Sequence, residues 1–208
     1  MRSHNTQIIS YLADYNQIDE LEKAIESGAD TLKICVRACY EGELVISENP
    51  VWDTQLSALQ EMGTLTLVQF FTLCNNRISL IVEIGSRERI VSEVIADIKG
   101  YRGSVALASA SLITASTAQV LMSELPIQLI CLEEGREVEW VRLAYYYGFS
   151  TVNIPFSAFS HHVVEQADDL EMDVNVFTVD AVGHARSLVE QGVCGIFTNN
   201  PRLLKEKL

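Results

Sequence analysis

Short apolar runs alternate with amphipathic stretches along the chain. The runs are rich in β-branched residues and predict strands, and between them apolar residues recur every three or four positions, as in helices. Strands that alternate with helices predict parallel pairing with right-handed crossovers. The predicted strands are Gln7–Tyr11, Thr31–Val36, Ser79–Ile84, Val105–Ala108, Ile127–Cys131, Thr151–Ile154, Asn175–Val179 and Gly195–Thr198.

Glycines mark the ends of several predicted helices. Gly28, Gly148 and Gly192 each follow a helical stretch and precede an apolar run, where a left-handed residue closes a helix. Strand–helix units repeated over 208 residues favour an α/β fold of the (β/α)8 TIM-barrel type. A doubly wound open sheet is the alternative, and we favour it less because no Gly-x-Gly-x-x-Gly loop follows the first strand.

One segment interrupts this alternation. Residues 38–63 connect the second strand to the next helix and are longer than an ordinary βα loop. Within them, Glu43–Ser47 predicts a short extra strand. We therefore expect one barrel domain over residues 1–208, with an insertion at about 38–63 on the face where barrel active sites form.

Composition narrows the classes of function. Apolar residues make up 48% and charged residues 21%, as in ordinary globular proteins. The formal charge of −13 argues against a nucleic-acid partner. No apolar run is long enough to span a membrane, and we expect no secretory signal. The five scattered cysteines predict buried free thiols in a reducing compartment, so we expect a cytoplasmic protein.

Several stretches, in order along the chain, are similar to stretches of one known protein family. The C-terminal stretches Val176–Asp180 and Gly192–Pro201 are similar to the family's seventh strand and its closing Gly-Val-Asp-Gly-Ile-Ile-Thr-Asp-x-Pro. Shorter similarities are Ala24–Asp30, Glu43–Ile46, Thr64–Phe71 and Leu80–Ile84. Together these stretches resemble the glycerophosphodiester phosphodiesterase family, and the resemblance implies a barrel of the PLC-like phosphodiesterase type. It also implies a divalent metal, Mg²⁺ or Ca²⁺, held by carboxylates, with histidines as acid and base.

The family's functional positions are mostly substituted in this sequence. Its His-Arg-Gly motif falls on Tyr11, Leu12 and Ala13, and its Glu-x-Asp metal ligands fall on Lys33 and Cys35. The second histidine falls near Ser47 or Glu48, and Gly85 replaces the lysine of the third strand. Glu83 is the family carboxylate that remains, and a lone carboxylate is a poor site for Mg²⁺ or Ca²⁺.

Two interpretations compete for most of the remaining polar residues. Glu83 either pairs with Lys33, which we favour, or binds a metal with help from Glu48, Asp14 or Asp180. Asp180 either caps the next helix, which we favour, or belongs to the site. Asn199 and Asn200 form either an anion-binding site at a helix N-terminus or a simple turn. The candidate ligand-binding residues are Lys33, Asn153, Phe177, Asp180 and Asn199.

Three hypotheses of function follow. The first is a catalytically impaired or inactive member of the phosphodiesterase superfamily that still binds a small phosphate ester or a partner. The second is a divergent metal-dependent phosphoric diester hydrolase of glycerophosphodiesters in lipid metabolism, with a site rebuilt from Glu48, Glu83, Asp180 and Asp14. The third is an interaction protein that uses the outer surface of the barrel. The sequence leaves the oligomeric state open.

Overall fold

The chain forms a closed barrel of parallel strands surrounded by helices. The structure is a computed structural model and describes residues 6–13, 16–85 and 90–208. The sheet order is β1-β9-β8-β7-β6-β5-β4-β2-β3, and β1 also pairs with β2, which closes the barrel and leaves β3 outside it. The strands are β1 (Gln7–Tyr11), β2 (Thr31–Ala38), β3 (Leu44–Ile46), β4 (Ser79–Ile84), β5 (Val105–Ser109), β6 (Ile127–Ile130), β7 (Thr151–Pro155), β8 (Asp173–Phe177) and β9 (Gly195–Thr198).

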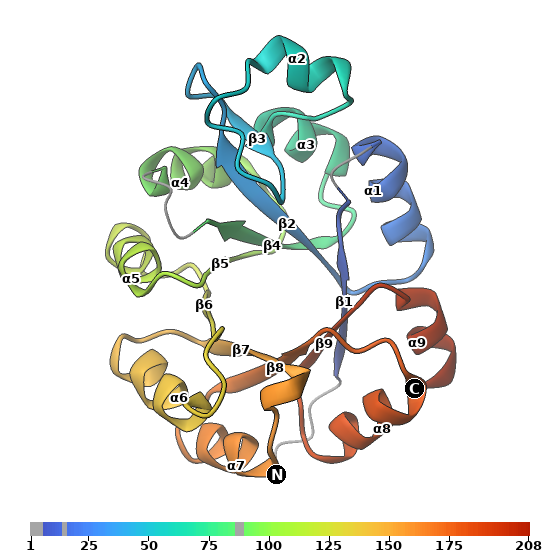
Figure 1. The fold of residues 1–208 in the computed structure, drawn as a ribbon, viewed down its shortest axis with the longest axis vertical. Helices are drawn as coiled ribbons and strands as arrows, with labels where there is room; N and C mark the ends of the chain where they lie inside the picture. The colour runs from blue at the N-terminus through green and yellow to red at the C-terminus, as the bar shows by residue number, and fades with distance from the viewer. Residues whose placement is uncertain (1–5, 14–15, 86–89) are drawn as a thin grey trace.

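Helices form a ring around the barrel (Figure 1). None of those in the described part of the chain is long and apolar enough to cross a membrane. They are α1 (Gln17–Glu26), α2 (Leu56–Glu61), α3 (Leu67–Cys74), α4 (Val91–Gly100), α5 (Leu112–Leu121), α6 (Glu137–Tyr146), α7 (His161–Asp169), α8 (Val182–Glu190) and α9 (Pro201–Lys207), and a 3-10 turn covers Phe156–Ala158. The (β/α)8 prediction is therefore confirmed.

The alternation of side chains along each strand produces two apolar layers. Outward-facing residues pack against the helices in one extended cluster that includes Leu32, Leu80 and Leu129. Inward-facing residues form a separate small cluster in the barrel interior, built from Ile9, Ile81, Ala108 and Phe197. A packed barrel interior restricts any site to the open end of the strands.

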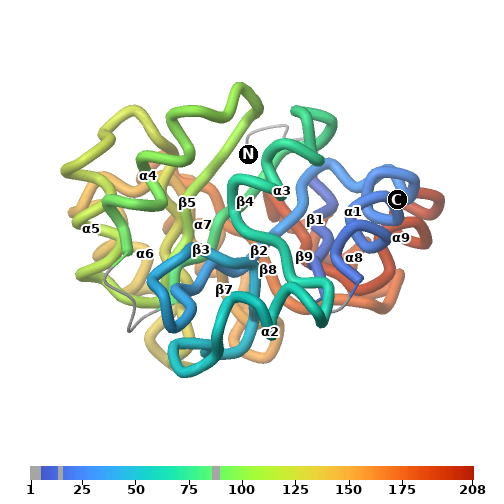
Figure 2. Tube along the Cα trace, turned by 90° about the horizontal axis from the view of Figure 1, so that it is seen from above, coloured from blue at the N-terminus to red at the C-terminus, as the bar shows by residue number. Residues whose placement is uncertain are grey.

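The insertion after β2 folds back on the strand that precedes it. β3 pairs antiparallel with β2, with Val36 opposite Ile46, and confirms the extra strand expected there. Cys39, Val45, Val51 and Leu59 form a small core of their own beneath α2, a helix that the sequence pattern did not predict. Figure 2 shows this segment projecting beyond one end of the barrel. That end is the carboxyl end of β2, as expected for an insertion at the active-site face.

The helix-ending glycines and one strand boundary test the sequence pattern in detail. Gly28, Gly148 and Gly192 have φ angles of 75°, 76° and 87°, which confirms their left-handed conformation. The prediction for the seventh barrel strand is wrong by two residues: the strand was expected at Asn175–Val179, whereas β8 covers Asp173–Phe177. Polar Asp173 and Asn175 alternate with valines at its start, so the apolar pattern alone placed the strand too late.

Candidate functional site

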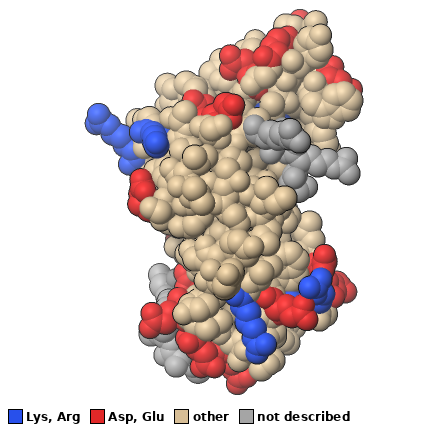
Figure 3. All heavy atoms as spheres, turned by 90° about the vertical axis from the view of Figure 1, so that its left-hand side faces the viewer, with Lys and Arg blue, Asp and Glu red and all other residues tan. Residues whose placement is uncertain are grey.

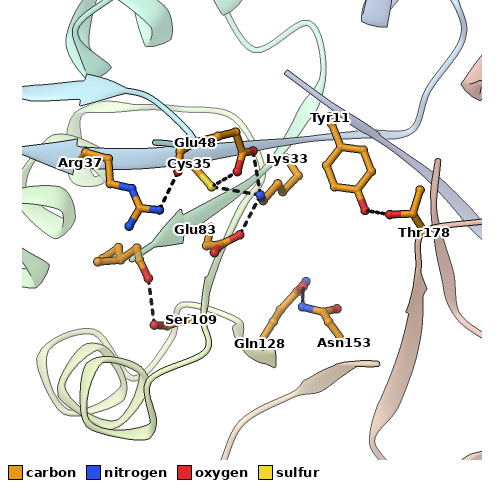
Figure 4. Close-up of polar contacts among 11 residues, drawn as sticks. Tyr11, Lys33, Cys35, Arg37, Glu48, Glu83, Ser109, Gln128, Asn153 and Thr178 are labelled. Atoms are coloured by element: carbon orange, nitrogen blue, oxygen red, sulfur yellow. Dashed lines mark hydrogen bonds and ion pairs between the residues drawn. The ribbon is translucent and has the colours of Figure 1, made fainter. Parts of the chain in front are cut away.

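A lysine occupies the centre of the barrel mouth. Lys33 lies on β2, two residues before Cys35 and four before Arg37, so all three side chains project to the inner side of the strand. The Lys33 ammonium lies 2.8 Å from Glu83 on β4 and 2.9 Å from Glu48, which follows β3. Figure 4 shows the two carboxylates converging on this ammonium. The predicted ion pair between Lys33 and Glu83 is confirmed, and Glu48 joins it.

Cys35 is part of the same cluster, which we call the Lys33 cluster: Lys33, Cys35, Glu48 and Glu83. Lys33 Nζ donates to Cys35 Sγ at 3.0 Å, and the thiol donates to the second oxygen of Glu48, also at 3.0 Å. Burial and then the charge of Glu83 raise the pKa of the Cys35 thiol, so it stays protonated. A buried neutral thiol is a poor nucleophile and a poor metal ligand.

The electrostatics of the cluster keep Lys33 charged. Burial alone would lower the pKa of Lys33, but the attraction of Cys35, Glu83 and Glu48 outweighs it and raises that pKa. Because Cys35 remains neutral, the lasting attraction comes from the two carboxylates. Lys33 is therefore a permanent cation, which excludes it as a general base or an amine nucleophile at neutral pH.

The residues at the mouth do not fit the divalent metal that the family resemblance implies. Mg²⁺ and Ca²⁺ need six or more oxygen ligands, whereas the two carboxylates here already contact an ammonium. Within residues 6–13, 16–85 and 90–208, no group of three or more His, Cys, Asp or Glu side chains is arranged to hold a metal ion. Asp14, a further expected helper, lies outside the described residues.

Histidines do not contribute to the mouth in the described part of the chain. His161 and His162 are exposed at the start of α7, within 3.7 and 3.4 Å of Glu165, as expected for a solvated first turn. His184 lies on α8, where its ring stacks on Phe156. None of these three lines the cavity at the mouth, and His4 lies outside the described residues.

A cavity of about 150 Å³ opens beside the Lys33 cluster. Five of the residues predicted from the sequence meet around it, together with apolar residues of the barrel strands. Its lining consists of Tyr11, Lys33, Ile81, Glu83, Ala108, Ile130, Leu132, Asn153, Phe177 and Phe197. The walls are thus mostly apolar, and the polar groups are an ammonium, a carboxylate, an amide and the Tyr11 phenol, which is the usual make-up of a small-molecule site.

Two hydrogen-bonded groups frame this cavity. The Tyr11 hydroxyl lies 2.8 Å from the Thr178 hydroxyl, and burial raises the pKa of Tyr11, so the phenol stays neutral. Asn153 Nδ2 donates to Gln128 Oε1 at 3.0 Å, and Asn175 Nδ2 donates to Asn153 Oδ1 at 2.9 Å. These three side chains, which we call the amide chain, fix the orientation of Asn153 at the cavity wall.

Other predicted residues lie away from the cavity. The expectation that Asp180 caps α8 is wrong: the N-cap is Ala181, and Asp180 accepts hydrogen bonds from the Thr198 hydroxyl and from the Asn199 backbone and side chain. Ser47 is buried and donates to the Asn49 carbonyl. Leu12 and Asn199 line a neighbouring groove of about 910 Å³, which also includes Glu48.

Arg37 contacts the Lys33 cluster through the backbone of Glu48, and the sequence interpretation missed it. Its Nη2 donates to the backbone carbonyl of Glu48 at 2.9 Å, and its Nε is buried without a hydrogen-bond partner. Figure 4 places the guanidinium beside Glu48, on the same side of β2 as Lys33. The alternation Lys33, Cys35, Arg37 along a strand was the signal that would have identified it.

Comparison with solved structures identifies the fold. No family model and no curated protein sequence matches the chain. A glycerophosphodiester phosphodiesterase from Parabacteroides distasonis is 18% identical with a TM-score of 0.86, covering 99% of this chain and 97% of its own. One from Thermotoga maritima is 19% identical with a TM-score of 0.83, covering 99% of both chains. An Oleispira antarctica phosphodiesterase, solved with the product sn-glycerol-3-phosphate, is 16% identical with a TM-score of 0.85, covering 97% of this chain and 96% of its own.

These similarities establish that the chain has the fold of the glycerophosphodiester phosphodiesterases, a (β/α)8 barrel. At such identities a shared fold does not carry a shared activity. The chemistry has to be judged from the Lys33 cluster and the cavity beside it.

Proposed function

We propose that this chain is a glycerophosphodiester phosphodiesterase-like barrel without metal-dependent hydrolase activity, which binds a small phosphate ester at its mouth. The observation that supports the loss of activity is the Lys33 ammonium, 2.8 Å from Glu83 and 2.9 Å from Glu48. A tethered cation neutralises the carboxylates that a divalent ion would need. A metal entering there would have to displace a buried lysine and leave that charge unpaired, which is costly.

Lys33 does not replace the metal functionally. Hydrolysis of a phosphodiester needs an activated nucleophile and stabilisation of the charge that develops on the phosphoryl oxygens. A protonated lysine stabilises charge, but it neither coordinates a water nor accepts a proton. The cavity lining contains neither a histidine nor a free carboxylate, since Glu83 is paired with Lys33.

The proposed ligand class is based on the size and chemistry of the cavity. A volume of about 150 Å³ with apolar walls suits a molecule of a few carbon atoms with one polar group. Lys33 brings a cation to the cavity wall. Arg37 lies further along the same strand, where it contacts the Glu48 carbonyl, and its Nε lacks an acceptor that a ligand oxygen would supply after a side-chain movement. A structural neighbour was solved with sn-glycerol-3-phosphate, which supports the same class.

Activity is tested with glycerophosphocholine and bis(p-nitrophenyl) phosphate in the presence of Mg²⁺, Ca²⁺ or Mn²⁺. We expect no turnover above buffer for the wild type. Metal-dependent turnover that Glu83→Gln abolishes would overturn this part of the proposal. It would instead establish a divergent metal-dependent phosphoric diester hydrolase.

Binding is tested separately by thermal shift and calorimetry with glycerol 3-phosphate, and with glycerol and inorganic phosphate as comparisons. We expect stabilisation by the ester, loss of that stabilisation in Arg37→Gln, and no change in the control Lys99→Gln on the exposed face of α4. If glycerol 3-phosphate does not raise the melting temperature at millimolar concentration, the phosphate-ester proposal fails, whatever the activity assay shows.

A further inference from the structure

A second cavity lies at the other end of the barrel, where the strands begin. Its volume is about 390 Å³, compared with about 150 Å³ for the cavity at the mouth. Ile81 contributes to both walls and belongs to the small apolar cluster of the barrel interior. The lining of the second cavity includes the first residues of four strands, Gln7, Thr31, Ser79 and Asp173. It is therefore a different cavity from the one beside the Lys33 cluster.

The barrel interior is polar around this second cavity. Bulky branched apolar residues dominate the interior of most (β/α)8 barrels. Here, four inward-facing polar residues that line the cavity are less than one-tenth exposed: Thr31, Gln128, Thr151 and Asn175. Buried polar groups are costly unless they find hydrogen-bond partners, so packing alone does not explain this wall.

The amide chain leaves one donor and one acceptor unused at the second cavity. Gln128 accepts from Asn153 through Oε1, and Asn175 donates to Asn153 through Nδ2. Within the part of the chain that the structure describes, Gln128 Nε2 and Asn175 Oδ1 have no hydrogen-bond partner. Both residues line the cavity and are more than nine-tenths buried. A molecule in the cavity therefore meets one free N–H donor and one free carbonyl acceptor.

The neighbouring strand leaves room for the Asn175 amide. Asn175 is paired with Gly195 on β9, and a methyl group at Gly195 would lie only 2.5 Å from Asn175 Oδ1. A glycine in a strand often marks such a close approach. The position of the free acceptor thus depends on Gly195, while the other end of the same amide is held by Asn153.

The charges around the second cavity favour a neutral ligand. Among the described residues that line it, Asp173 is the only charged side chain. The chain has a net charge of −13, and Figure 3 shows acidic side chains toward both ends of one face of the molecule. An anion is repelled by this field, because no lining cation offsets it as Lys33 does at the mouth. One carboxylate is also too few for a metal ion that needs several oxygen ligands.

We propose that the second cavity binds a neutral sugar or cyclic polyol of five or six carbon atoms. Each hydroxyl group of such a molecule both donates and accepts, so it supplies partners for Gln128 Nε2, Asn175 Oδ1 and the Asp173 carboxylate. Apolar lining residues such as Ile81 and Pro126 offer a surface to its C–H groups. The proposal is independent of the phosphate ester proposed for the mouth.

Saturation-transfer NMR titrations of the full chain with D-ribose, D-glucose and myo-inositol test the proposal. We expect at least one of them to bind with a dissociation constant below about 10 mM, and the anionic analogue D-glucuronate not to bind. Melting temperatures are a poorer readout, because sugars at high concentration stabilise folded proteins without binding them. If none of the three neutral compounds binds, or if glucuronate binds as tightly as they do, the proposal is overturned.

A pair of matched threonine variants tests the location of binding. Thr151 lines the second cavity and Thr114 lies on α5, and both are 5% exposed. Valine keeps the shape of threonine and removes its hydroxyl, so Thr151→Val is expected to weaken binding about two- to tenfold. Thr114→Val is expected to bind like the wild type. Equal affinities of the two variants, each checked for folding by circular dichroism, would overturn the proposal.

Two further measurements separate this cavity from the mouth. Arg37→Gln is expected to bind the sugar like the wild type, and Thr151→Val is expected to bind glycerol 3-phosphate like the wild type. A crystal structure with the tightest-binding neutral compound is expected to show its hydroxyl groups on Gln128 and Asn175. Loss of sugar binding in Arg37→Gln, or ordered water alone on those two amides, would contradict the proposal.

Discussion

Two sides of the barrel interior satisfy their buried polar groups by different chemistry. On the β2–β4 side, the Lys33 cluster joins an ammonium to two carboxylates. On the β6–β8 side, the amide chain joins Gln128, Asn153 and Asn175 through neutral hydrogen bonds. Figure 4 shows the charged cluster and the Gln128–Asn153 pair as separate groups. Buried polar groups on the two sides are thus paired either by charge or by neutral hydrogen bonds. We expect the loss of one partner to destabilise the fold more in the charged cluster than in the amide chain.

The largest loss in the free energy of unfolding is expected from Lys33→Met. This change removes the cation and leaves Glu48 and Glu83 facing each other without compensation. Removing one partner of a buried ion pair typically costs 3–5 kcal/mol, and Glu48 is partly exposed, so we expect a loss of about 3 kcal/mol in the free energy of unfolding. Urea denaturation followed by circular dichroism measures this loss.

A double-mutant cycle provides the control for this prediction. Lys33→Met combined with Glu83→Gln removes one of the two unpaired carboxylates, so the double variant is expected to be more stable than Lys33→Met alone. Ca²⁺ is expected to stabilise Lys33→Met and to leave the wild type unchanged. If the losses in free energy of unfolding from the two substitutions simply add, or if Lys33→Met is as stable as the wild type, the Lys33 cluster does not stabilise the fold through its ion pairs.

Much of the charged side was predictable from the sequence. Lys33 and Glu83 lie on strands that neighbour each other in a barrel, and an unpaired charge in the interior is too costly to persist. The position of Glu48 was harder to predict, because it depends on the antiparallel pairing of β3 with β2 and on the separate core beneath α2. A six-residue helix such as α2 is too short to show a helical period in the sequence.

The amide chain and Asp180 show where sequence interpretation stops. Asn153 was identified as a site residue because it lies near the end of a strand, but its partners Gln128 and Asn175 depend on the register between β6, β7 and β8. Asp180 precedes a helix, which favours a capping role, yet the Asn199 amide on the neighbouring strand end competes for the same carboxylate. Competition between local and long-range donors is decided by the fold, not by the local sequence.

A smaller effect is expected from Asn153→Ala on the amide side. The change leaves Gln128 Oε1 without its donor and Asn175 Nδ2 without its acceptor, both in the barrel interior. We expect a loss of about 2 kcal/mol, and because no charge is exposed, this loss is expected to be the same at low and high salt. Thermal denaturation at two ionic strengths measures it. A strong salt dependence, or a loss larger than that of Lys33→Met, would reverse the comparison between the two sides.

The smallest effect is expected from Asp180→Asn, at the rim beyond both clusters. Burial alone would raise the pKa of Asp180, but the hydrogen bonds from Asn199 and Thr198 outweigh it and hold that pKa below its ordinary value. A carboxyl whose folded-state pKa is lowered stabilises the fold above its unfolded-state pKa of about 3.9, and this contribution is lost as the pH falls through the folded-state pKa. Because Asp180 is exposed, we expect the free energy of unfolding of the wild type to be only about 0.5 kcal/mol higher than that of the variant at pH 7. This corresponds to about one to two degrees in melting temperature. Near pH 2 we expect no difference between the two. A difference that persists in acid would mean that Asp180 acts through packing and not through its charge.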